Sequence, residues 1–113
     1  MAGNYGDHAK ELDKRLAELF KAGPKPMRAY GQLVEAAGAS GAIEAKVKEL
    51  MALAISITSR CEDCIVYHCR AAIGHGATEA EVVETIGVAV EMGGGPAAVY
   101  GARAYRVYRD LTA

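Results

Sequence analysis

The apolar residues of the chain recur at helical spacing, in segments that end at glycine or proline. In the first segment, residues 7–22, Leu12, Leu16, Leu19 and Phe20 lie three or four positions apart, and the run Gly-Pro-Lys-Pro follows. This period is typical of an amphipathic helix, whereas a half-buried strand would alternate at every second residue. No segment of the chain alternates in that way, so the pattern predicts an all-α protein.

Capping residues divide the rest of the chain into further helices. Ser59 followed by Glu62, and Thr78 followed by Glu81, have the spacing of a capping box, in which the first side chain caps the helix and the second returns the bond. Ser40 can cap the long third helix, and Pro96 suits a first helical position. About six helices are therefore expected, the later five over residues 26–37, 40–58, 60–74, 79–92 and 96–110.

The chain of 113 residues has the length of one domain. We expect a single unit over residues 1–113, with N-terminal helices in 1–39 and a core in 40–110. The second half of the third helix is apolar on nearly every face, and a helix without a polar face has to be buried all round. One chain of this size offers too little cover, which predicts a homo-oligomer.

Charge and hydropathy remove several classes of function. The formal net charge is −1, so there is no electrostatic basis for binding nucleic acid or an anionic membrane. The longest uncharged apolar run, residues 50–59, is far shorter than the ~20 residues of a membrane span. The N-terminal residues lack the apolar core of a secretory signal. We therefore expect a cytoplasmic protein, and stable disulfides are rare in that compartment.

All three cysteines and two of the three histidines lie between residues 57 and 76. With Ser59 as the cap, Cys61 would be the second residue of a helix, Cys64 one turn further and His68 four residues after that, on one stripe. A thiol in the first turn of a helix faces unpaired N–H groups, which lower its pKa from ~8.5 to ~3.5–7.5 and favour the reactive thiolate. Cys69 points away from this stripe and is assigned to the core. The pattern favours a redox-active dithiol.

Other interpretations of the cluster stay open at this stage. A structural disulfide across so short a loop would contribute at most roughly 2 kcal/mol. A zinc site could use Cys61, Cys64 and His68, but a structural site needs a fourth ligand and no second paired motif is present. A haem attachment would require histidine directly after Cys64, where Ile65 stands. The cluster could also simply fill space.

An all-α dithiol with a histidine one turn on resembles the alkylhydroperoxidase D-like branch of the carboxymuconolactone decarboxylase superfamily. The family pattern has a glutamate twelve residues before the first cysteine, then C-x-x-C, then a histidine four residues after the second cysteine. Glu49, Cys61, Cys64 and His68 stand at those spacings. The runs ATEAEVVE and GGGPA are also similar to the family, and the resemblance covers about residues 40–105.

The resemblance implies a cofactor-free, metal-free thiol peroxidase that forms trimers or hexamers, with the hexamer preferred. It implies that Cys64 is attacked by peroxide, that Cys61 resolves the product, and that His68 and Glu49 relay protons. An external thiol system, possible donors being dihydrolipoyl proteins, would reduce the pair again. Nearness to the helix end favours Cys61 as the attacked thiol and nearness to His68 favours Cys64; we take Cys64. Some members carry a histidine between the cysteines, where this chain has Asp63.

Two other functions compete with this one. The first is a decarboxylase acting on a lactone, although decarboxylase-type relatives generally lack the complete dithiol. The second is a non-enzymatic oligomer that uses the cysteine pair as a redox switch. The remaining histidines are given no chemical role: His8 is placed in a mobile N-terminal tail, and His75 at the C-terminal end of a helix, where a cation is favourable.

Overall fold

The computed structural model describes residues 4–113 and confirms the all-α prediction. This part of the chain holds six helices and no strand. The helices are α1 (Tyr5–Ala22), α2 (Pro24–Gly38), α3 (Ala45–Thr58), α4 (Glu62–Gly74), α5 (Glu79–Gly93) and α6 (Gly95–Leu111). No helix in the described range is both long and apolar enough to cross a membrane.

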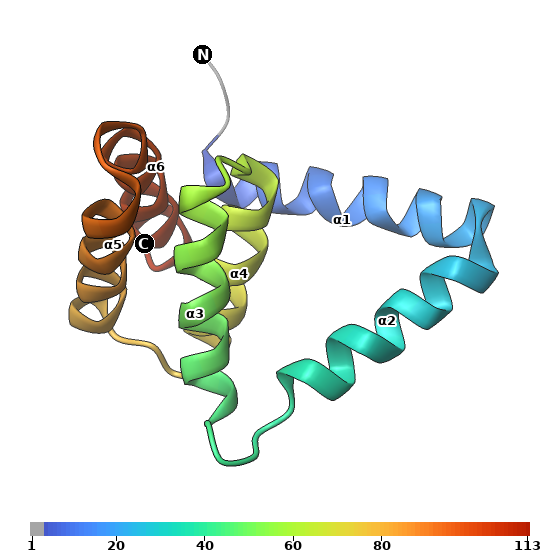
Figure 1. The fold of residues 1–113 in the computed structure, drawn as a ribbon. Helices are drawn as coiled ribbons and strands as arrows, with labels where there is room; N and C mark the ends of the chain where they lie inside the picture. The colour runs from blue at the N-terminus through green and yellow to red at the C-terminus, as the bar shows by residue number, and fades with distance from the viewer. Residues whose placement is uncertain (1–3) are drawn as a thin grey trace.

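The helices form a body and a projecting hairpin. Helices α3, α4, α5 and α6 pack together as the body, and α1 lies with its N-terminal half against α4 and α6 (Figure 1). The C-terminal half of α1 leads away from the body, and α2 returns towards the start of α3, so that α1 and α2 form a V. Helix α2 buries none of its residues. A cavity described below is lined by residues of this V and of α4.

The core lies between the four helices of the body. Its largest fully buried side chains are Leu53, Ile57, Ile65, Val66, Cys69, Val82 and Val107. Small residues let α5 and α6 approach closely: a Cβ atom added at Gly101 would stand 2.7 Å from Ile86 Cγ2. The prediction that Cys69 belongs to the core is confirmed, since its side chain is fully buried.

The start of α5 follows the prediction, whereas the start of α4 does not. Thr78 and Glu81 form the expected capping box in both directions. Ser59, by contrast, ends α3, and its hydroxyl donates to the Ile55 carbonyl oxygen at 2.8 Å. Arg60 then takes a left-handed conformation with φ 59°, and Cys61 becomes the cap of α4. The predicted capping box at Ser59 is wrong because that hydroxyl is already used by the preceding helix.

The start of α3 also lies later than the sequence suggested. The helix begins at Ala45 rather than directly after Ser40. The Ser40 hydroxyl nevertheless accepts a hydrogen bond from the Ala45 N–H at 2.8 Å, across the intervening turn. The side chain therefore caps the helix at a distance, which a local spacing rule does not describe.

Apolar side chains remain exposed on two helices of the body. Ile43, Val47, Met51 and Ile55 stand four residues apart along the segment that leads into and forms α3, and each is at least 40% exposed. On α5, Val83, Val88 and Met92 are exposed as well. Contiguous apolar surface of this kind marks an interaction site in soluble proteins.

Candidate dithiol active site

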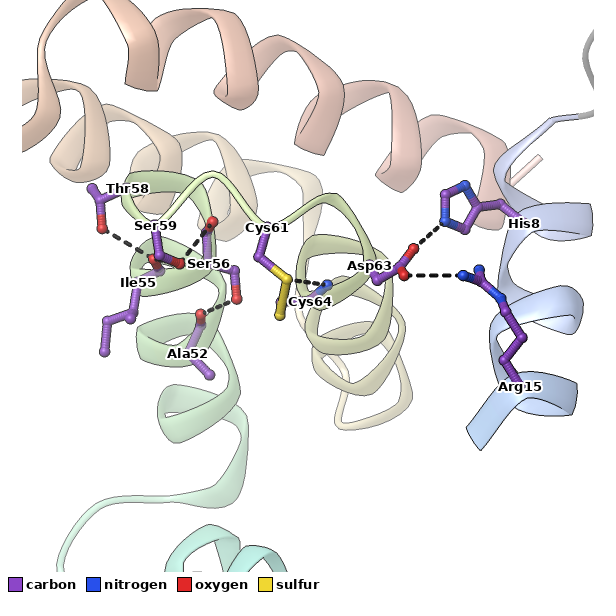
Figure 2. The surroundings of a disulfide bond; sticks show 10 residues. All are labelled: His8, Arg15, Ala52, Ile55, Ser56, Thr58, Ser59, Cys61, Asp63 and Cys64. Carbon is purple, nitrogen blue, oxygen red and sulfur yellow. Dashed lines mark hydrogen bonds and ion pairs between the residues drawn. A yellow bond between two sulfur atoms is a disulfide. The ribbon is translucent and has the colours of Figure 1, made fainter. Parts of the chain in front are cut away.

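Cys61 and Cys64 are joined by a disulfide at the N-terminus of α4 (Figure 2). Cys61 has the extended backbone of a cap residue, with φ −107° and ψ 99°. Its sulfur accepts a hydrogen bond from the Cys64 N–H at 3.2 Å, in the position that a serine or aspartate oxygen usually takes. A negative charge on this sulfur would therefore be stabilised by the helix end. Both cysteines are partly exposed to solvent.

His68 and Glu49 connect α4 with α3, the helix that precedes the dithiol in the chain. Nδ1 of His68, on α4, lies 2.7 Å from Oε2 of Glu49, on α3. The two side chains are only 27% and 17% exposed, so water competes weakly for this contact. A carboxylate on one ring nitrogen fixes the orientation of an imidazole and leaves its other nitrogen, Nε2, for chemistry. The spacing-based prediction thus placed together two residues that do touch.

A cavity of about 310 Å³ connects Cys64 with His68. Its polar lining consists of Cys64, His68 and Asp63, at the α4 side. The rest is apolar or aromatic and comes mainly from the V of α1 and α2: Leu12, Leu16, Phe20, Tyr30, Val34 and Tyr67. Cys61 does not line this cavity. A larger hollow of about 720 Å³ along the end of α6 contains no cysteine or histidine.

Two carboxylates in the first turn of α4 are held by other helices. Glu62 accepts hydrogen bonds from the Tyr5 hydroxyl and from Arg103, both at 2.9 Å. Burial, followed by the contact with Glu62, raises the pKa of the Tyr5 hydroxyl, so this group stays protonated and donates. Asp63 lies 2.7 Å from His8 Nε2 and 3.4 Å from an Arg15 nitrogen.

The placement of His8 corrects the sequence analysis. His8 lies within α1 and is bound to Asp63, not in a mobile tail (Figure 2). It precedes the buried Leu12 by four residues and so shares the inward face of α1. The four-residue spacing to Leu12 could have indicated that His8 faces the body of the protein. It could not have indicated that His8 contacts Asp63. Asp63 therefore contacts an imidazole that comes from another helix.

Cys69 cannot join the chemistry of the pair. Burial raises the pKa of its thiol to about 12, so it remains protonated at any physiological pH. Within the described residues, no group of three histidine, cysteine, aspartate or glutamate side chains is arranged to hold a metal ion. The reactive groups at the cavity are thus Cys64 and the imidazole held by Glu49, and Cys61 is bonded to Cys64 from outside it.

Comparison with known proteins places the chain in a family. The sequence profile of the carboxymuconolactone decarboxylase family matches residues 24–106, and the chain belongs to this family. An uncharacterized protein of Cupriavidus necator is 35% identical over 103 residues, which are 91% of each chain. An uncharacterized protein of the cox locus of Paracoccus denitrificans is 32% identical over 85% of this chain and 86% of its own.

Solved structures of the family have the same fold. A carboxymuconolactone decarboxylase family protein from Legionella pneumophila, in its apo form, superposes with a TM-score of 0.92 at 34% identity, over 96% of this chain and 97% of its own. A family member from Thermotoga maritima has a TM-score of 0.83 at 30% identity, over 93% and 90%. For the Thermotoga protein a part in the antioxidative response has been suggested.

Proposed function

We propose that this protein is a cofactor-free thiol peroxidase that cycles Cys61 and Cys64 between dithiol and disulfide. The observation that carries the proposal is that Cys64 and the Glu49-bound His68 line one cavity, while Cys61 is bonded to Cys64 from outside it. A nucleophile, a base and a group that orients the base are the parts that activated-thiol chemistry requires. The suggested antioxidative role of the Thermotoga relative supports the same conclusion.

The proposed reaction proceeds in two steps from the reduced protein. His68 takes the proton of the Cys64 thiol, and the thiolate attacks the outer oxygen of a hydroperoxide ROOH. The O–O bond breaks, Cys64 becomes a sulfenic acid, and the leaving RO⁻ receives the proton from His68 as ROH. The Cys61 thiolate then attacks the sulfur of the sulfenic acid. The hydroxyl of the sulfenic acid leaves as water together with the proton that the Cys61 thiol gives up, and the disulfide forms.

The cavity favours Cys64 as the peroxidatic cysteine and Cys61 as the resolving one. Only Cys64 is in contact with the space that a substrate could occupy. The Cys64 N–H donates to the Cys61 sulfur, which makes Cys61 the better leaving group when the disulfide is attacked at Cys64. The reducing thiol would therefore form its mixed disulfide with Cys64.

Turnover needs an external dithiol that supplies two electrons. One of its thiols attacks Cys64 and releases Cys61 as a thiolate; its second thiol then displaces Cys64 and leaves as a disulfide. The apolar walls of the cavity suit a reductant on a flexible hydrocarbon arm, such as a dihydrolipoyl protein, and a cytoplasmic location would keep such donors reduced. The same walls suit organic hydroperoxides better than hydrogen peroxide, which has no apolar part to bury.

We also propose that the working form is a homo-oligomer, with a hexamer preferred over a trimer on the family resemblance. The exposed stripe formed by Ile43, Val47, Met51 and Ile55 supports an interface on α3. Light scattering at micromolar concentration tests this, and a monomer under those conditions would contradict it.

The activity is tested by following cumene hydroperoxide in the presence of excess dihydrolipoamide. Catalytic consumption is expected for the wild type and for Cys69→Ser, and none for Cys64→Ser. A single stoichiometric oxidation without turnover would instead indicate a redox switch. Consumption of carboxymuconolactone that persists after both reactive cysteines are alkylated would indicate a decarboxylase.

A further inference from the structure

The first turn of α4 contains a conflict between helix stability and thiol chemistry. Glu62 and Asp63 stand directly before Cys64, and acidic side chains in this position stabilise a helix through its dipole. Each negative charge also opposes the formation of a thiolate nearby, because like charges in a partly buried site repel. Ionisation of Cys64 at neutral pH is therefore favoured when other groups hold these two carboxylates and turn them away from the sulfur.

Each carboxylate has its own pair of partners from other helices. Glu62 is held by Tyr5 at the start of α1 and by Arg103 of α6. Asp63 points away from the disulfide towards α1, where His8 contacts one of its oxygens and Arg15 the other (Figure 2). Asp63 lines the same cavity as Cys64, whereas Glu62 does not. Of the two carboxylates, Asp63 is therefore the one whose charge would act on the reacting sulfur.

The charged and titratable groups around the pair come from every neighbouring element. They are His8 and Arg15 of α1, Tyr30 of α2, Glu49 of α3, Arg60 of the turn before Cys61, Glu62, Asp63, Tyr67 and His68 of α4, and Arg103 of α6. Among the carboxylates, Glu49 is bound to His68 and Glu62 to Arg103. Asp63 depends on α1 alone.

We propose that His8, assisted by Arg15, is a positioning residue for the dithiol: its contact holds the Asp63 carboxylate turned towards α1 and away from Cys64 (Figure 2), so that the carboxylate opposes ionisation of Cys64 less. This inference rests on the proposed function, in which Cys64 is the thiol that reacts. It extends that function, because residues of α1 would then control how readily Cys64 of α4 reacts. His8 acts through Asp63 and does not touch the sulfur.

The test measures the reduced thiols directly and needs no peroxide. Reduced protein is alkylated with iodoacetamide from about pH 5 to about pH 10, a range that spans the usual thiol ionisation, and the rate at Cys64 is read by mass spectrometry. The variants are His8→Gln, Asp63→Asn and the double variant. Asp13→Asn is the matched control, because it breaks another α1–α4 ion pair, with Arg70, that lies away from the cavity. Arg15→Gln is an independent arm should His8→Gln fail to fold, as judged by circular dichroism.

His8→Gln is expected to move the midpoint of the alkylation profile up by about half a pH unit, which is a threefold lower rate below the midpoint. Arg15→Gln should move it in the same direction by less, since its contact is longer and exposed. In the Asp63→Asn background, His8→Gln should move nothing, because the carboxylate through which His8 acts is gone. Asp13→Asn should leave the wild-type midpoint in place.

Three results would overturn the inference. The first is a wild-type midpoint in His8→Gln, or in Arg15→Gln if the histidine variant does not fold. The second is an equal shift by His8→Gln with and without Asp63, which would mean that the histidine acts on its own. The third is a shift by Asp13→Asn as large as that of His8→Gln. This would show that weaker packing of α1 on α4, and not the contact with Asp63, causes the shift. A wild-type protein that alkylates as expected but shows no peroxide turnover would remove the proposed function and leave this result standing.

Discussion

Replacing Glu49 by glutamine tests whether the imidazole of His68 is an active part of the site. The substitution keeps the shape of the side chain and removes its charge, so the contact with His68 Nδ1 at 2.7 Å loses its ionic character. Hydrogen bonds to charged groups contribute about 1.5–3 kcal/mol. The low exposure of both side chains keeps the loss near that range, and we expect peroxide reduction to slow by roughly 10- to 150-fold.

The assay is steady-state consumption of cumene hydroperoxide under excess dihydrolipoamide, with Glu91→Gln as the control. Glu91 is an exposed glutamate on α5 and should tolerate the same change without loss of rate. His68→Ala is expected to cost about 10²-fold or more, the usual scale of general acid–base help. The double variant of Glu49 and His68 should be no slower than His68→Ala, because residues that act as one unit are not additive.

Two outcomes would contradict a role of Glu49 in proton transfer through His68. Full activity in Glu49→Gln would show that the carboxylate has no part in the proton transfer. Losses that multiply in the double variant would show that Glu49 and His68 act separately, and that their contact is only structural.

Three further predictions concern the cysteines and the core. Cys61→Ser should undergo one stoichiometric oxidation that stops at a sulfenic acid on Cys64, whereas Cys64→Ser should form none; mass spectrometry of a trapped sulfenic acid distinguishes them, and the reverse pattern would exchange the two roles. Burial raises the pKa of the Cys69 thiol to about 12, so the unfolded chain loses this proton first. The free energy of unfolding of the reduced protein, measured by urea titration at each pH, should then fall as pH rises above about 9, by at most ~1.4 kcal/mol per pH unit from this group. This decrease with pH should be smaller in Cys69→Ala. Gly101→Ala should destabilise the fold by about 1–3 kcal/mol because its Cβ would overlap a side chain of α5, whereas Gly87→Ala, on an open helix face, should raise the melting temperature. Equal effects of the two glycine substitutions would contradict the close contact of α5 with α6.

Local sequence rules were sufficient for most of the fold. Apolar spacing and the glycine and proline breaks predicted the helices, and the capping box at Thr78 was found in both directions. The same rule failed at Ser59, because a serine at a junction can serve either the helix before it or the one after it. The left-handed Arg60 settles that choice, and φ > 0 at an arginine is not foreseeable from residue type.

The site was predictable where its parts lie in one pattern and not where they come from distant segments. The spacing of Glu49, Cys61, Cys64 and His68 indicated which residues belong together, and two of them are in hydrogen-bond contact. The contact of His8 with Asp63 joins residues 55 positions apart, and it depends on how α1 crosses the end of α4. Such a crossing follows from tertiary packing and leaves no local signature.

In the proposed reaction, Cys61 and Cys64 convert a hydroperoxide to an alcohol while their dithiol is oxidised to a disulfide. The most direct measurement mixes the fully reduced protein with one equivalent of cumene hydroperoxide, then counts free thiols and maps the modified residues by mass spectrometry. We expect the loss of both thiols of the pair, one equivalent of cumyl alcohol, a disulfide between Cys61 and Cys64, and an unmodified Cys69. Unchanged thiols with the hydroperoxide still present, or oxidation found on Cys69 alone, would contradict it.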